Sequence, residues 1–99
     1  MRMLLQASID TEISNRMITD GKMPEVLEQL LGLLKPEASY FYALHGRRGF
    51  TMVVDLPDEA SLITMIEPLW VQLGADIEVV PCVNADELRT GLGRLAAQS

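Results

Sequence analysis

Residues that bind metals or form cross-links are scarce in this sequence. Its 99 residues include one cysteine, Cys82, and one histidine, His45. A single cysteine cannot form a disulfide within the chain, and one histidine with one distant cysteine does not make the ligand set of a zinc site. The GxxxxGK and GxGxxG motifs of nucleotide binding and the GxSxG motif of hydrolases are also missing. We therefore expect no metal and no cofactor, and no motif assigns a catalytic residue.

The sequence also has few positively charged residues and no long apolar run. Eight Lys and Arg residues stand against fourteen Asp and Glu, which gives a net charge of −6. A negative chain repels the phosphate backbone, so we expect no nucleic-acid partner. No apolar run approaches the roughly 18 residues that span a bilayer, and Gln6 and Asp10 interrupt the apolar stretch at the N-terminus, which is too short for a signal peptide. We expect no membrane association and a cytoplasmic location.

The bulk composition is that of an ordinary folded domain. Hydrophobic residues make up 48% of the chain and charged residues 22%. No repeat, low-complexity stretch or linker divides the sequence. We expect residues 1–99 to form one domain.

The first third of the chain changes from strand to helix periodicity. Residues 2–9 alternate, with Met3, Leu5, Ala7 and Ile9 on one face and Leu4, Gln6 and Ser8 on the other. The next segment has apolar positions at helical spacing, interrupted at Gly21 and Pro24. A near-seven repeat passes through that interruption, so the pattern predicts one long helix over 11–34, kinked at "DGKMP" and ended at Lys35-Pro36. The repeat consists of Ile13, Met17, Pro24, Leu27, Leu31 and Leu34.

The remainder predicts a hairpin, a second long helix, another strand and a C-terminal helix. Two strand-like runs, 39–45 and 50–56, flank "GRRG", which indicates a four-residue turn. Residues 57–74 have a helical apolar stripe that Pro68 should bend or divide, and residues 75–83 read as a strand. Asn84 and Glu87 form a capping-box pattern for a last helix, which Gly91 and Gly93 weaken.

This order of elements predicts an α+β fold, the ferredoxin-like βαββαβ arrangement with a four-stranded antiparallel sheet plus a C-terminal helix. Two helices cover only one face of such a sheet. The other face would carry Leu4, Gln6 and Ser8 with either set of side chains from the hairpin, and both sets contain aromatic or branched apolar residues. An uncovered face of that kind marks an interface. We therefore expect a homodimer in which two sheets pair face to face.

Four segments resemble a known family: "KPEASYFY", "GFTMVVDLPD", "EPLW" and "ADIEVVPCVNADEL". They are similar to small uncharacterised bacterial proteins of the dimeric α/β-barrel superfamily, and the last two are similar to the corresponding end of muconolactone isomerases. The resemblance implies a ferredoxin-like fold that pairs as a dimeric α/β barrel. The superfamily includes isomerases, monooxygenases and haem-dependent enzymes, and no catalytic motif of the isomerases matches residue by residue, so the resemblance assigns no catalytic role.

A charged cluster at the hairpin tip is the first candidate for chemistry. His45 titrates near neutrality, and the neighbouring Arg47 and Arg48 can form paired hydrogen bonds with a carboxylate. Hairpin tips are exposed and mobile, however, and a solvated turn is the favoured interpretation.

The candidate pocket consists of Tyr40, Tyr42, Glu67, Trp70 and Glu78. The two tyrosines lie two apart on one strand and point to the same face. Glu67 and Trp70 are neighbours on a helical surface around Pro68, and Glu78 belongs to a strand that borders the space between paired sheets. Ordinary packing is nevertheless the favoured interpretation for Tyr40, Tyr42 and Trp70, and solvent exposure for Glu67.

Two functions remain open. The favoured one is a non-catalytic homodimeric module that binds a small apolar molecule or a protein partner. The alternative is a cofactor-independent isomerase or cyclase acting on a small apolar or aromatic metabolite, with Tyr40, Tyr42, Glu67 or Glu78 transferring protons. The first is favoured because the sequence offers no clear acid and base pair.

Overall fold

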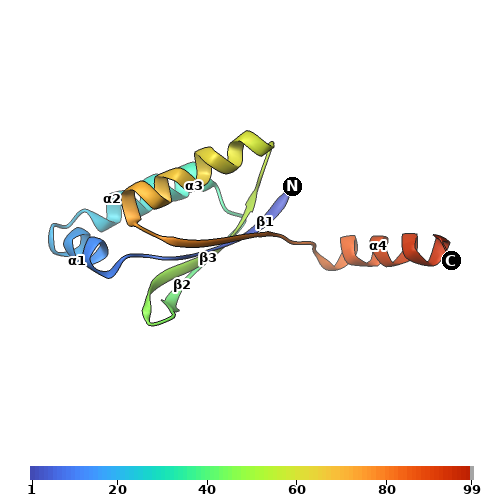
Figure 1. Cartoon of the computed structure of the whole chain (residues 1–99), viewed down its shortest axis with the longest axis horizontal. Coiled ribbons are helices and arrows are strands. Elements are labelled where there is room, and N and C mark those ends of the chain that lie inside the picture. The colour runs from blue at the N-terminus through green and yellow to red at the C-terminus, as the bar shows by residue number, and fades with distance from the viewer. Residues whose placement is uncertain (99) are drawn as a thin grey trace.

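The structure is a computed structural model that describes residues 1–98. Its elements are, in chain order, β1 (Arg2–Ser8), α1 (Thr11–Thr19), α2 (Met23–Leu34), β2 (Ala38–Leu44), β3 (Arg47–Asp55), α3 (Glu59–Leu73), β4 (Asp76–Pro81) and α4 (Ala85–Gln98). The strands form one antiparallel sheet in the order β2-β3-β1-β4. Helices α2 and α3 lie over one face of it (Figure 1). This is an α+β architecture compatible with the predicted ferredoxin-like fold.

The core lies between the sheet and these two helices. The alternation predicted for β1 is present: Met3, Leu5, Ala7 and Ile9, just beyond its end, are buried. In β3, Phe50, Met52 and Val54 are buried on the same side, and Leu69 of α3 packs among them in one cluster of buried residues. The sheet thus contributes one apolar face, which the helices cover.

The prediction of one long helix over 11–34 is wrong, because the chain forms two helices there, α1 and α2. Gly21 has a φ of 71°, a left-handed conformation that does not continue an α-helix. The amide of Lys22 donates to the carbonyl of Met17 at 2.8 Å, which closes the end of α1. Pro24 then lies in the first turn of α2, where its missing N–H leaves no bond unmade. The apolar repeat does not reveal this break, since Met17 of α1 and Leu31 of α2 both pack against the core.

Pro68 does not divide the second long helix, which runs from Glu59 to Leu73 without interruption. Met65, Leu69 and Leu73 lie on one face of α3 and are buried. These contacts on both sides of the proline hold the helix on the core although the proline removes one backbone hydrogen bond. The helix ends where predicted, at Gly74 with a φ of 54°.

The hairpin turn is shorter than predicted and lies earlier in the chain. Leu44 pairs with Arg47, so the turn consists of His45 and Gly46 alone. Their φ values are 54° and 76°, as a two-residue type I′ turn requires. Glycine adopts such angles without strain, and a type I′ turn matches the twist of the flanking strands, which explains why the tight turn forms here. Arg47 and Arg48 therefore belong to β3.

The strand register determines which side chains occupy the sheet face that α2 and α3 leave uncovered, here called the open face. Tyr40 lies opposite Thr51, and Gln6 lies between Thr51 and Glu78. The open face consequently carries Gln6, Tyr40, Tyr42, Thr51 and Glu78. Phe41 points to the helix side, with its ring centroid 6.0 Å from that of Phe50.

The predicted C-terminal helix forms, and it projects from the rest of the molecule (Figure 1). The capping box is present: the amide of Glu87 donates to Asn84 Oδ1 and the amide of Asn84 donates to Glu87 Oε1, both at 2.8 Å. Arg2 hydrogen-bonds the same carboxylate. The projection gives the molecule a length of 59 Å against widths of 28 and 18 Å, and a radius of gyration of 16.3 Å, where about 13 Å is usual for a compact domain of this size.

Candidate functional site

A long apolar groove with a volume of about 650 Å³ lies between the α1–α2 pair and the β2–β3 hairpin. It exists because β2 is an edge strand that neither α2 nor α3 covers. Phe41, on the helix side of β2, is accordingly 53% exposed. The lining of the groove includes Ile9, Thr11, Asn15, Ile18, Met23, Val26, Leu27, Leu30, Phe41, Tyr42, Ala43, Arg47, Arg48 and Phe50. Most of these side chains are apolar, so the groove suits an apolar molecule.

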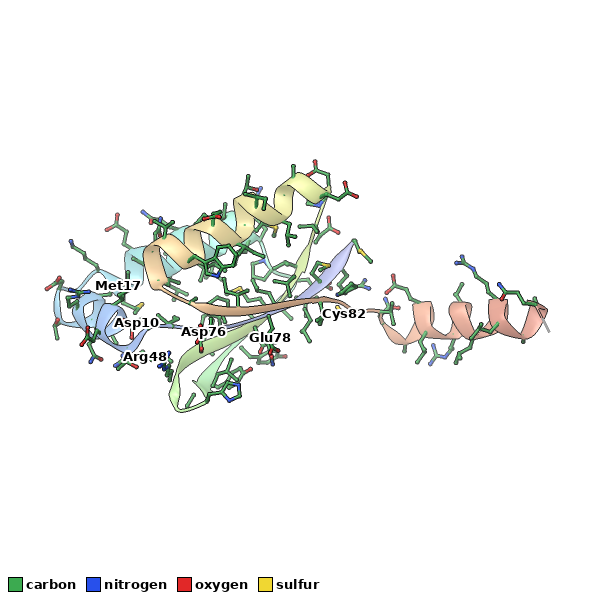
Figure 2. All side chains as sticks on the ribbon, in the orientation of Figure 1. Asp10, Met17, Arg48, Asp76, Glu78 and Cys82 are labelled. Carbon is green, nitrogen blue, oxygen red and sulfur yellow. The ribbon has the colours of Figure 1, made fainter. Side chains whose placement is uncertain are left out.

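Arg48 places a positive charge in the lining of this groove. Its Nη1 donates to Ser14 Oγ and to Asn15 Oδ1, both at 2.8 Å. Figure 2 shows Arg48 beside α1, which carries both partners. Within residues 1–98, no hydrogen bond or ion pair engages its Nε or Nη2. The guanidinium is thus held at a fixed place with N–H groups left for a ligand.

Helix α1 is itself held firmly where it meets Arg48. The side chain of Asp10 caps the helix by accepting from the amide of Ile13 at 3.0 Å. Ser14 is fully buried, and the amide of Ile9 donates to the Arg48 carbonyl at 2.8 Å. Two different elements therefore fix the position of this arginine.

The structure separates the three residues of the predicted hairpin cluster. His45 lies exposed in the turn, whereas Arg47 is 3.8 Å from Asp76 of β4, measured from Nη1 to Oδ2. Arg48, one residue along the strand, points to the opposite side of the sheet from Arg47. Arg47 and Arg48 both contribute to the lining of the apolar groove, whereas His45 does not. Of the two arginines, Arg48 is the one held there by hydrogen bonds to α1.

Three of the predicted pocket residues come together on the open face. The hydroxyl of Tyr42 is hydrogen-bonded to Thr51 Oγ1 and accepts from Gln6 Nε2 at 3.5 Å. Tyr40 is 70% exposed and Tyr42 41% exposed. Glu78 pairs with Gln6 across the strands, on the side of the sheet away from α3 (Figure 2). A hollow of about 500 Å³ on this side includes Glu78 in its lining.

The other two predicted residues, Glu67 and Trp70, lie in the helix layer on the outside of α3. Both are exposed, Trp70 by 50%. The small hollow beside Pro68 has a volume of about 60 Å³, and neither residue is part of its lining. The five predicted residues therefore lie on two surfaces separated by the sheet and the core.

The carboxylates with a shifted pKa lie at helix starts, away from the groove. The pKa of Asp58 is lowered because its carboxylate accepts from the side chain of Ser61, at 2.7 Å, and from the Ser61 amide. The pKa of Glu87 is lowered by the amide of Asn84 and by Arg2. Both shifts are explained by the capping of α3 and α4, which is a structural role.

Sequence reasoning missed the groove and the part that Arg48 has in it. The signal was available in the alternation of β3, because Arg48, Phe50 and Met52 share one face. Placing the turn at "GRRG" assigned Arg48 to a loop and concealed that alternation. The gap between α2 and the edge strand has no comparable sequence signal, since it depends on how two helices share a four-stranded sheet.

No helix within residues 1–98 is long and apolar enough to cross a membrane. Across residues 1–98, no cluster of three or more His, Cys, Asp or Glu residues is arranged to hold a metal ion.

No family model matches the sequence, and no curated protein matches it. Among solved structures, the de novo designed protein Ferredog-Diesel is similar with a TM-score of 0.43 and 14% identity, over 82% of this chain and 85% of that chain.

Proposed function

We propose that this protein is a homodimeric, non-catalytic module that binds a small, mainly apolar molecule in the groove between α1, α2 and the β2–β3 hairpin. The observation that carries the proposal is the groove itself, about 650 Å³ in volume. Sites for small molecules have volumes of about 300–1,000 Å³, mostly apolar walls and a few placed polar groups. The groove matches each of these three properties.

Arg48 suggests the polar part of the ligand. Its Nε and Nη2 are the two nitrogens that a carboxylate engages side by side, and the bonds of Nη1 to Ser14 and Asn15 leave both available. Apolar residues such as Met23, Leu27 and Phe41 would contact the rest of the molecule. A small apolar acid therefore fits the groove better than a neutral or cationic compound.

The geometry gives less support to the isomerase or cyclase alternative. Its proposed proton-transferring groups are Tyr40, Tyr42, Glu67 and Glu78. The Tyr42 hydroxyl and Glu78 face the open side of the sheet, and Glu67 lies on α3. A substrate in the groove would touch neither Glu67 nor Glu78, because both lie on other surfaces. Acid–base catalysis needs direct hydrogen-bond reach or one intervening water, so neither carboxylate could transfer a proton to that substrate.

The homodimer is supported by the open face. Tyr40 and Val80 are exposed there by 70% and 49%, beside polar groups that already bond one another. Pairing two such faces about a two-fold axis would bury both tyrosine sets at once. The groove lies on the other side of the sheet, so face-to-face pairing leaves it open to a ligand.

Titration with the fluorescent probe 1-anilinonaphthalene-8-sulfonate, followed by competition with decanoate and decanol, tests the proposal. The probe should bind to one site per chain, and decanoate should displace it at lower concentration than decanol. Ala43→Trp, which fills the groove from an exposed position of β2, should abolish binding. Ala60→Trp, at an exposed position of α3 outside the groove, is the control. Equal binding by both variants would refute the assignment of the groove.

A further inference from the structure

We infer that α4 is an exchanged arm, which packs on the open face of a second copy of this chain. The inference rests on the homodimer of the proposed function, and it adds the element that completes the dimer. Three observations support it: α4 lacks the contacts that keep a short helix folded, it has an apolar stripe turned to solvent, and it extends beyond its own sheet.

A helix with the length and composition of α4 is not stable by itself. It has 14 residues, and isolated helices shorter than about 12–15 residues are marginal in water even when they are rich in alanine. Gly91 and Gly93 lie in its interior, and each disfavours the helix by roughly 0.8–1.0 kcal/mol relative to alanine. The helical state of α4 therefore depends on contacts with something outside it.

Within the described residues, the bonds that join the start of α4 to the domain of its own chain are polar. Arg2 holds Glu87, and the amide of Cys82 donates to the Arg2 carbonyl at 3.2 Å. No residue of α4 is buried. The bonds at its start fix where the helix leaves the domain, but they leave its apolar side chains in solvent.

Those apolar side chains form one stripe. Leu88, Leu92 and Leu95 follow one another at spacings of four and three, which places them on one helical face. They are exposed by 53%, 55% and 62%. A stripe of this kind is the surface with which a helix packs on a partner.

The position of α4 relative to its own sheet indicates that the open face of a second copy is the surface on which α4 packs. Figure 1 shows α4 continuing beyond the end of β4, away from the helix layer formed by α2 and α3. Stacked sheets lie about 10 Å apart, and a helix with its side chains is about 10–12 Å wide. A sheet stacked below the first and extending past its end would consequently meet α4 at ordinary packing distance.

The size of the open face also favours the arm. Four strands spaced about 4.8 Å apart and about seven residues long give a flat area of roughly 450 Å². A stable interface buries about 800 Å² per partner. A helix of about 21 Å by 10 Å adds roughly 200 Å² of flat area, so an exchanged α4 increases the surface available to a second copy by nearly half.

Isotope-filtered NOESY on a mixture of ¹³C-labelled and unlabelled protein tests the inference directly. We expect contacts between the methyl groups of Leu92 and Leu95 in one copy and the rings of Tyr40 and Tyr42 in the other. A dimer without contacts between copies from these leucines would overturn the inference. Contacts of the leucines with the tyrosines of their own chain would overturn it as well.

Sedimentation of two matched variants provides an independent measurement. Leu92→Lys puts a charge into the stripe and should raise the dimer dissociation constant about tenfold or more, since a leucine loses its burial in each arm. Thr90→Lys adds the same charge on the other face of α4 and should change the constant less than about twofold. Circular dichroism should report loss of α4 helix in Leu92→Lys alone. An unchanged dissociation constant in Leu92→Lys would refute the exchange.

The failure of this inference can be distinguished from failure of the groove assignment. Binding of 1-anilinonaphthalene-8-sulfonate should persist in the dissociated Leu92→Lys protein, because the groove belongs to one chain. A wild-type monomer would refute both the homodimer and the arm and leave the groove assignment standing. A dimer that Leu92→Lys does not weaken would refute the arm alone.

Discussion

Replacing Gly49 with alanine should destabilise the protein, whereas the same replacement at Gly32 should stabilise it. Gly49 is buried in β3, opposite Ser8 of β1 and Tyr42 of β2. A Cβ built there would lie 2.8 Å from the carbonyl oxygen of Ala7 and 2.8 Å from the Cβ of Leu44. Both obstacles are at or next to the backbone, so no side-chain rotation relieves them, and the strands themselves would have to separate.

The expected cost follows from overpacking, which typically lowers the free energy of unfolding by about 1–3 kcal/mol. Each kcal/mol shifts the Tm of a domain of this size by about 4–8 °C, so Gly49→Ala should melt at least about 4 °C below the wild type. Gly32 lies inside α2 with nothing within 4 Å of its built Cβ. There, alanine should add about 0.5–1 kcal/mol through helix propensity.

Thermal unfolding followed by circular dichroism at 222 nm measures both variants under the same conditions. The opposite signs provide the control, because the chemical change is identical. If Gly49→Ala has the same Tm as the wild type, then β2, β3 and β1 do not approach one another as described. The placement of the groove beside the β2–β3 hairpin would then be wrong as well.

Three other substitutions test separate parts of the account. His45→Asn should raise the free energy of unfolding by about 0.5–1 kcal/mol in urea titrations, because asparagine tolerates the positive φ of the turn; a decrease would contradict the type I′ turn. The lowered pKa of Asp58 contributes stability above about pH 4 that is lost as the pH falls through that pKa. The Asp58→Asn variant should therefore approach wild-type stability below that pKa. Urea titrations measure the difference in unfolding free energy between the two proteins, and a difference that does not narrow between pH 6 and pH 2 would contradict the cap. Arg48→Met should weaken decanoate binding about tenfold, as expected for a charge-assisted hydrogen bond, and leave decanol binding unchanged; equal loss of both would contradict the role of the guanidinium.

The parts of the fold that depend on local chemistry could be predicted from the sequence. The alternation of β1 sorts Met3 and Leu5 from Leu4 and Gln6, and the structure buries the former pair. The capping box of Asn84 and Glu87 forms as written in the sequence. In both places the signal involves residues a few positions apart, whose preferences tertiary packing reinforces.

The predictions of secondary structure were wrong where the backbone angle of one residue overrode the pattern of apolar residues or glycines around it. A repeat of apolar residues predicted one helix, but a single left-handed glycine, Gly21, ended it. Two glycines suggested a turn at "GRRG", but the positive φ of His45 and Gly46 makes these two residues the turn, which begins one residue earlier than predicted. Composition marks where such angles are permitted and does not determine which of the permitted sites is used.

The candidate site was the least predictable part. Tyr40, Tyr42 and Glu78 were correctly placed on strands, but which hairpin face lay open depended on the register with β1. Arg48 meets Ser14 and Asn15 from more than thirty residues away along the chain. Contacts over that distance are set by the packing of α1 on the hairpin, for which a single sequence has no direct signal.

Native mass spectrometry in the presence of decanoate, on the wild-type protein and on Ala43→Trp, tests the central claim most directly. We expect a wild-type dimer that carries one decanoate per chain, and a dimer of Ala43→Trp that carries none. A monomer would contradict the homodimer. Equal loading of the two proteins, or no loading of the wild type, would contradict the groove as the ligand site.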